Sequence, residues 1–192
     1  SWSYSFTTKN KKGTKKREFG RFNQYLPNQW LKRSPSVDLG CAVENPESMS
    51  TRALVIHGAK DLRVEEAEVP TLWENEVRVR IRAGGICGSD LHYYEDGGFG
   101  TVRIREPMIL GHEVAGEVEE VGSGVTRVKV GDRVAVNPSR PCYACPQCQK
   151  GLYNHCENMR FYGSAMPFPH IQGAFREHLV AGEGQCFAFD PS

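Results

Sequence analysis

The sequence lacks several features that would assign it to a class at once. No apolar run approaches the ~18–20 residues of a membrane span, and no segment resembles a secretory signal. There is almost no net charge, since 24 Lys and Arg face 23 Asp and Glu. No internal repeat is visible, and "GGFG" and "GSG" fail the G-x-G-x-x-G spacing of a dinucleotide-binding turn. We therefore expect a cytoplasmic protein with no membrane partner and no general affinity for nucleic acid.

The charge is unevenly distributed along the chain. Residues 1–48 carry nine Lys and Arg against four Asp and Glu, whereas the remainder carries fifteen against nineteen. The first 48 residues show neither helical nor strand periodicity, and Met49 then opens a strand-like segment. We predict a disordered basic extension over 1–48, to which Cys41 belongs, and a globular domain over 49–192. A basic arm whose aromatic side chains contact phosphate backbones is the alternative for the extension.

From Arg52 onward the pattern is typical of β-structure. Short segments such as "ALVIHG", "LRVEEAEV", "GEVEEVG", "DRVAVNP" and "AFREHLVAG" are separated by turns that contain Gly and Pro. In "EVRVRIRAGG", Val77, Val79 and Ile81 alternate with charged residues, as in a half-buried strand. One short helix is expected after Cys87, with Ser89 as its N-cap. The fold class is therefore mainly β, a compact barrel or sandwich.

Four of the seven cysteines lie within sixteen residues. Cys142, Cys145, Cys148 and Cys156 follow the pattern C-x2-C-x2-C-x7-C, which can wrap a tetrahedral zinc ion. Four thiolates fill the coordination shell, so we predict a structural zinc site rather than a catalytic one. Two disulfides or four free thiols are the alternatives, and His155 is a possible substitute ligand.

An open metal site needs fewer protein ligands, from residues far apart in the sequence. Two stretches offer them: "GGICGSDLHYY" around Cys87, and "LGHEVAGEVEEVGSGV" around His112 and Glu113. Cys87 lies just after a strand among glycines, where the backbone can bend to present its sulfur, and His112 follows Gly111 at the start of another strand-like segment. Taken singly, a lone Cys or His is more often a core residue than a ligand.

These stretches together carry a resemblance to a known family. "GHEVAGEVEEVGSGV" matches the zinc-containing alcohol dehydrogenase signature G-H-E-x2-G-x5-G-x2-V at every fixed position, and "GGICGSDLH" resembles the same family's first zinc-ligand loop. The four-cysteine segment follows in the family's order and spacing. The chain over about 50–192 thus resembles the medium-chain dehydrogenase/reductase superfamily, whose catalytic domain is a GroES-like β-barrel with a zinc-binding lobe. "CGSDLHYY" and "NMRFYGSAMPFPHIQGAF" resemble the polyol branch and its L-idonate 5-dehydrogenases.

The resemblance implies roles for five residues. Cys87 and His112 match the family's catalytic zinc ligands, and Glu113 matches an acidic ligand of polyol-type members. The alternative for Glu113 is a carboxylate that supports a ligand or the fold without binding the metal. Ser89 matches the hydroxyl that accepts the proton of the alcohol. His92 matches the imidazole that relays that proton to solvent, with a plain surface histidine as the alternative.

The resemblance also implies cofactors and partners. We expect two zinc ions, NAD or NADP in the full-length enzyme, a polyol or aldonate substrate and a homo-oligomer. Tyr93 is a candidate to line a polyol pocket, with a core position as the alternative. Arg160 and His170 are candidate partners for an aldonate carboxylate, because Arg forms paired hydrogen bonds with carboxylates; a role in fixing the zinc lobe is the alternative for Arg160. The family's Rossmann domain has no counterpart in the sequence, so we expect the chain to be inactive alone. A zinc-ribbon-like nucleic-acid-binding module and a non-catalytic GroES-like scaffold are the competing interpretations.

Overall fold

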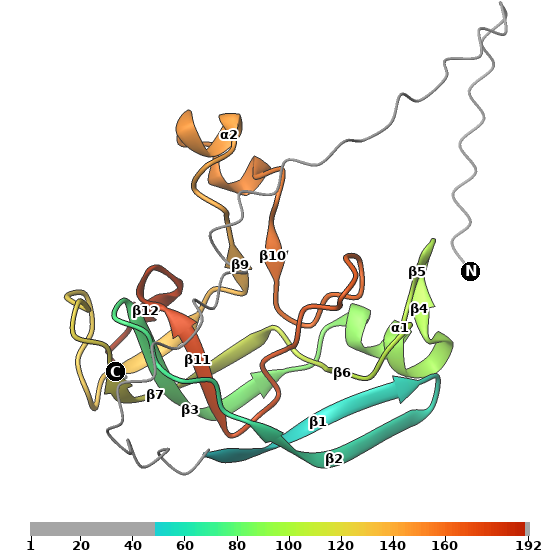
Figure 1. Cartoon of the computed structure of the whole chain (residues 1–192). Coiled ribbons are helices and arrows are strands. Elements are labelled where there is room, and N and C mark those ends of the chain that lie inside the picture. The colour runs from blue at the N-terminus through green and yellow to red at the C-terminus, as the bar shows by residue number, and fades with distance from the viewer. Residues whose placement is uncertain (1–48, 191–192) are drawn as a thin grey trace, which may run out of the picture. The chain divides into compact units, whose positions relative to one another are not determined.

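Antiparallel strands dominate the computed structural model, which describes residues 49–190 (Figure 1). The longer strands are β1 (Ser50–Gly58), β2 (Asp61–Glu68), β3 (Glu76–Gly85), β7 (Glu113–Val121), β8 (Arg133–Val136) and β11 (His178–Gly182). The short ones are β4 (Gly98–Phe99), β5 (Val102–Arg103), β6 (Met108–Ile109), β9 (Ser139–Arg140), β10 (Arg160–Phe161) and β12 (Cys186–Ala188). The mainly β fold is confirmed. The predictions for residues 1–48 lie outside the described residues.

The larger sheet has five strands in the order β11-β3-β7-β8-β12. Its inner face follows the period of two that the sequence predicts. Val77 and Val79 on β3 are fully buried, while Arg78 and Arg80 between and beyond them form ion pairs with Glu120 and Glu119 of β7. Valines of β7 and β8 and Leu179 of β11 complete this core. Burial of these branched side chains is the main stabilisation of the sheet.

A second sheet, β2-β1-β6, closes against the first. β1 is held to the segment that precedes β11 by the Leu54 amide, which donates to the Phe175 carbonyl, and to the segment after β6 by the Leu110 amide, which donates to the Leu54 carbonyl. A second core, with Ile56 and Met108 fully buried, fills the space between β1, β6 and the helix. The hydrogen bond of Leu110 therefore fixes the position of the backbone two residues before His112.

Helix α1 (Gly88–Asp96) begins two residues earlier than the sequence predicts. Its N-cap is Cys87 and not Ser89, and the Asp90 carboxylate accepts the Cys87 amide hydrogen at 2.9 Å, as the third helical residue of a capping box does. The prediction favoured Ser89 because serine is a preferred N-cap, whereas here the acidic residue satisfies the free amide. The helix ends at Gly97, which is left-handed with φ +67°.

A two-stranded ribbon of β9 and β10 rises from the barrel and carries the cysteine-rich lobe (Figure 1). The lobe contains only α2 (Pro146–Gln149) and the 3-10 turn η1 (Tyr153–His155). A second such turn, η2 (Glu183–Gln185), precedes β12. Within residues 49–190, no helix combines the length and apolar character needed to cross a bilayer.

Candidate metal centres

Three metal-ligating side chains meet where β3 ends and β7 begins. Cys87, His112 and Glu113 each offer one ligand atom, and these atoms lie within 4.8 Å of one another. The pairing of β3 with β7 explains their convergence, because Gly85 lies opposite Glu113 in the register. Cys87 is two residues beyond the end of β3, and His112 is one residue before the start of β7. One thiolate, one imidazole and one carboxylate suit zinc and leave a fourth position open.

Glycines make room for this arrangement. Gly111 has φ +90°, a conformation that side chains rarely adopt, and a Cβ there would overlap the ring of Phe175. A Cβ on Gly85 would approach the Glu113 carboxylate to 2.6 Å. The geometry of the site thus requires glycine at position 111, whereas at position 85 the Glu113 side chain could move aside.

A buried carboxylate lies behind the ligands. Asp90 is 3% exposed, and its Oδ1, which has no hydrogen-bond partner among the described residues, is 3.8 Å from Nδ1 of His112. An acceptor in this place favours the His112 tautomer that carries its hydrogen on Nδ1, which leaves Nε2 to bind a metal. Because the same carboxylate holds the Cys87 amide, Asp90 positions two of the three ligands. The residues present therefore fit a catalytic-type zinc site.

An open groove of about 730 Å³ lies beside the ligands. It is lined by the end of β3, by His112 and the start of β7 at Glu113, and by Val136, Pro138 and Phe161. The Phe161 ring lies 5.3 Å from the His112 ring, centroid to centroid, and is tilted against it. The groove therefore joins an apolar wall to a potential metal centre, as a site for the carbon skeleton of an alcohol requires.

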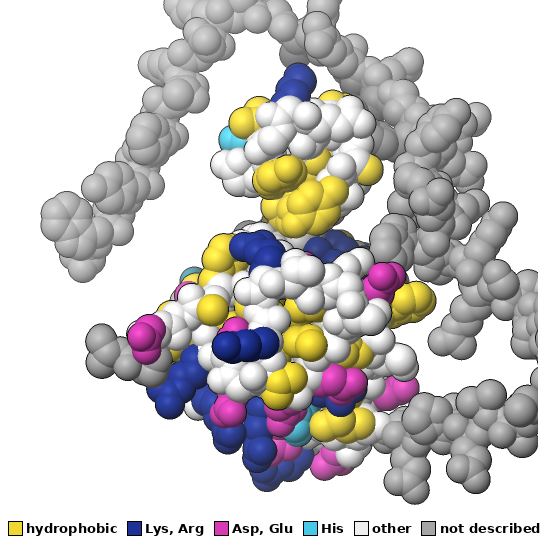
Figure 2. Space-filling view, turned by 90° about the vertical axis from the view of Figure 1, so that its left-hand side faces the viewer, with side chains coloured by type: hydrophobic (Ala, Val, Ile, Leu, Met, Phe, Trp, Pro, Cys, Tyr) yellow, Lys and Arg dark blue, Asp and Glu magenta, His cyan; other side chains and the backbone are white. Residues whose placement is uncertain are grey.

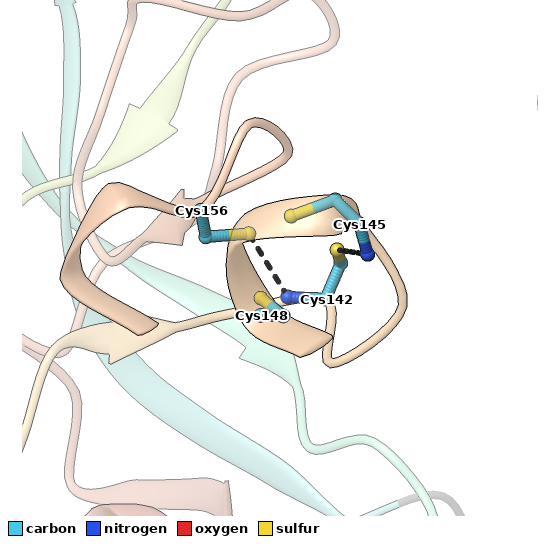
Figure 3. Close-up of side chains that lie close together, drawn as sticks. All are labelled: Cys142, Cys145, Cys148 and Cys156. Atoms are coloured by element: carbon cyan, nitrogen blue, oxygen red, sulfur yellow. Dashed lines mark hydrogen bonds between the residues drawn. The ribbon is translucent and has the colours of Figure 1, made fainter. Parts of the chain in front are cut away.

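The four cysteines of the lobe form a second cluster. In Figure 3 their side chains converge, and the four sulfur atoms lie within 4.8 Å of one another. Sulfurs in a zinc tetrahedron with bonds of ~2.3 Å are separated by roughly 3.8 Å, so small adjustments close the site. All the described cysteines are free, so the disulfide alternative is not seen among them. His155, on the surface of the lobe, is not part of the cluster.

Backbone amides donate hydrogen bonds to sulfur atoms of the lobe and so favour the thiolate form that binds a metal. The amide of Cys142 donates to the Cys156 sulfur at 3.2 Å, and that of Cys145 to the Cys142 sulfur at 3.3 Å (Figure 3). Donors from Ala144 and Cys145 lower the pKa of Cys142 to about 6, whereas burial raises the pKa of Cys148 to about 12. Binding of zinc by all four sulfurs must therefore release a proton from Cys148 at neutral pH.

The two residues expected to move protons lie on α1. Ser89 is partly buried and follows the Cys87 ligand by two residues, and His92 is exposed with Nδ1 3.5 Å from the Asp96 carboxylate. Neither lines the groove. The helix places Ser89 nearer the ligand end and His92 nearer solvent, and their proton-transfer role stays a prediction.

The candidate substrate contacts are not brought together at the groove. Tyr93 is 3% exposed, and its hydroxyl accepts the amide hydrogen of Ala165 inside the second core. His170 donates from Nδ1 to the Pro167 carbonyl and accepts at Nε2 from the Arg105 amide, so both ring nitrogens are occupied. Arg160 and His170 both line a different cavity. These positions favour structural roles for Tyr93 and His170.

The sequence interpretation missed two residues of the site. Asp90 lies three residues after Cys87, and that N-cap-to-third-residue spacing was the available signal. Phe161 adjoins the predicted Arg160, but strand alternation turns the two side chains to opposite sides of β10, one to each cavity.

A β-barrel that carries an open Cys-His-Glu cluster and a closed four-cysteine lobe defines the catalytic domain of a zinc-type alcohol or polyol dehydrogenase. The comparison with protein families agrees. The model of the alcohol dehydrogenase GroES-like domain matches residues 73–191, and the chain belongs to this family. The GroES-like fold and the polyol dehydrogenase relationship predicted from the sequence are confirmed.

Individual relatives are polyol and sugar-acid dehydrogenases. The chain is 42% identical over 142 residues to L-idonate 5-dehydrogenase (NAD(P)(+)) of Escherichia coli, covering 73% of this chain and 40% of that protein. It is 42% identical over 134 residues to sorbitol dehydrogenase of Bacillus subtilis, covering 70% and 36%. The crystal structure of the E. coli L-idonate enzyme superposes with TM-score 0.69 at 41% identity, covering 74% and 40%. The chain thus spans about 40% of the length of these relatives.

Proposed function

We propose that this chain is the catalytic domain of a zinc-dependent, NAD(P)-linked dehydrogenase that oxidises a secondary alcohol of a polyol or sugar acid. The preferred substrate is L-idonate, which is oxidised to 5-keto-D-gluconate. The observation that carries the proposal is the cluster of Cys87, His112 and Glu113 beside an open groove. The similarity to an L-idonate dehydrogenase supports the substrate, and the equally close sorbitol dehydrogenase keeps the class at polyols and aldonates.

The roles of the chain's own residues follow from their places. Cys87, His112 and Glu113 hold the zinc ion, which supplies Lewis acidity that lowers the pKa of an alcohol bound beside it. Asp90 orients His112 and Cys87. Ser89 accepts the hydroxyl proton of the substrate while it passes on its own, and His92, an exposed residue in the middle of the same helix, releases a proton to solvent. Phe161 packs against the carbon chain and limits access of water.

The second zinc ion has a different task. Four thiolates from Cys142, Cys145, Cys148 and Cys156 leave it no open position, so it holds the lobe together and takes no part in the reaction. The lobe has few buried side chains besides Cys145 and Cys148, which makes the metal its principal cross-link.

The first experiment is a count of zinc per chain by elemental analysis. The purified chain is expected to hold two equivalents, and the Cys87→Ala/His112→Ala double variant one. A Cys186→Ala variant is the matched control, because Cys186 is a buried thiol outside both clusters. One equivalent in the chain that stays unchanged in the double variant contradicts the catalytic centre.

Activity provides the second test. Hydride transfer requires a nicotinamide ring held within reach of the carbinol carbon, and the sequence contains no G-x-G-x-x-G turn for a dinucleotide. We expect no turnover of L-idonate with added NAD or NADP by these 192 residues alone. Steady oxidation of L-idonate by the purified chain refutes this part of the proposal.

A further inference from the structure

A second cavity lies at the base of the ribbon that carries the lobe. It has a volume of about 450 Å³ and is lined from β2, β6, β9, β10 and β11. Three arginines, Arg140, Arg160 and Arg176, share this lining. Figure 2 shows Lys and Arg side chains on the surface just below the lobe. The metal ligands do not line this cavity, which therefore differs from the groove described above.

Two of the arginines form a like-charge pair across the ribbon. In the register of β9 and β10, Arg160 is the direct partner of Arg140. Like charges directly opposite each other in an antiparallel pair repel, because their side chains leave the same face a few ångströms apart. The strands consist of only two residues each, so few other contacts offset this repulsion. An anion between the two guanidinium groups would offset this repulsion, because each group would then be attracted to the anion.

The third arginine is partly buried and lacks an acidic partner among residues 49–190. Nε of Arg176 donates to the Gly173 carbonyl at 3.1 Å, and no hydrogen bond from its terminal nitrogens is present within the described part of the chain. Burial lowers the pKa of the Arg176 guanidinium. A partly buried cation without a counter-charge loses part of its hydration, and a bound anion would offset that loss.

The acidic residues nearby do not balance the three arginines. Glu76 lies 3.6 Å from Arg140, and Glu68 is part of the cavity lining. Arg160 and Arg176 form no salt bridge with any residue in the described range. Burial raises the pKa of the Tyr162 hydroxyl in the same lining to about 12, and the charges of Arg140 and Arg176 offset only part of that rise. Three guanidinium groups thus face two nearby carboxylates, those of Glu68 and Glu76, which leaves an excess of positive charge at the cavity.

We propose that this cavity binds a phosphate-type oxyanion, either inorganic phosphate or the phosphate group of a small ester. Guanidinium groups recognise phosphate and carboxylate with paired N–H donors. A tetrahedral anion fits better here than a planar carboxylate, because the arginines come from three different segments and a phosphate presents oxygens in several directions. The bound anion joins the ribbon, through Arg140 and Arg160, to the barrel, through Arg176.

The test is isothermal titration of the full zinc-loaded chain with inorganic phosphate at constant ionic strength. Arg160→Gln is the informative variant, because Arg160 is exposed and its loss leaves the core intact. Arg82→Gln is the matched control, since Arg82 is an exposed arginine paired with Glu117 and lies outside the cavity. We expect one phosphate per chain, binding weakened about tenfold or more by Arg160→Gln, and no change in Arg82→Gln.

Other results overturn the proposal. Phosphate that binds equally well to Arg160→Gln is held elsewhere, for example by a zinc ion in the groove. Heat that does not exceed that of a chloride titration shows that no site exists. Phenyl phosphate distinguishes the two sources: tighter binding than phosphate identifies an ester as the ligand, and weaker binding identifies the free anion. Failure of this test does not affect the dehydrogenase proposal. That proposal depends on the metal ligands beside the groove, whereas the phosphate site depends on the arginines of the second cavity.

Discussion

Replacement of Asp90 by Asn is the sharpest test of how the open metal centre is built. Asp90 is 3% exposed, accepts the Cys87 amide hydrogen at 2.9 Å and places Oδ1 3.8 Å from His112 Nδ1. The amide oxygen of Asn can still accept from Cys87, so the start of α1 is kept. Its NH2 group then faces His112 Nδ1 and favours the tautomer with the hydrogen on Nε2, the atom expected to bind the metal.

The expected result is a selective loss of affinity. Changes of such supporting carboxylates weaken metal binding about 10–100-fold, which corresponds to about 1.4 to 2.8 kcal/mol of binding free energy. The assay is chelator competition on the cobalt-substituted chain, in which the centre with one thiolate and the centre with four give different absorption bands. Only the affinity of the one-thiolate centre should fall, while the lobe keeps its metal.

A matched control is available on the same helix. Asp96→Asn makes the same chemical change at a side chain that is 67% exposed and 3.5 Å from His92 Nδ1. Its metal affinities should equal those of the unchanged chain. If the metal affinity of the one-thiolate centre in Asp90→Asn stays within about twofold of that in this control, the Asp90 carboxylate does not orient His112.

Three further predictions concern the core, the turn before the ligands and the lobe. Ile56→Ala, at a fully buried position, should lower the free energy of unfolding by about 2–5 kcal/mol in urea denaturation; a loss below 1 kcal/mol contradicts the packing. Gly111→Ala should cost about 1–3 kcal/mol for its φ of +90° alone and more through contact with Phe175, and should lower zinc content; normal zinc refutes it. In the metal-free chain Cys142, with a pKa of about 6, should be mostly thiolate at pH 7, and its reaction with iodoacetamide should slow as the pH falls below 6. Cys186, which is buried and has a pKa of about 11, should stay unmodified; peptide mapping measures both.

Local patterns predicted much of the fold and of the site. The alternation in β3 indicated which valines face inward, because a strand has a period of two whatever its neighbours are. The cysteine spacings and the Gly-His-Glu stretch indicated both metal clusters, since ligands of one cluster lie close in sequence or follow a recognisable motif. The family match confirmed the barrel.

Features that depend on pairing distant segments were not predicted. The opposition of Arg140 and Arg160 follows from the register of two strands twenty residues apart, and the sequence alone does not set that register. The burial of Tyr93 depends on Ala165, far along the chain. The N-cap of α1 was misassigned because propensity favoured Ser89, whereas the Asp90 carboxylate determined the start of the helix.

The ribbon of β9 and β10 also makes the lobe a replaceable part. Because the two strands pair side by side, the chain leaves the barrel at Arg140 and returns at Arg160 through neighbouring points. A segment whose ends already lie together can be shortened, exchanged or grafted with little disturbance of the scaffold beneath it, since the cost of closing a loop grows only slowly with length. Evolution and protein engineering can therefore vary this projection independently of the groove in which the reaction is proposed to occur.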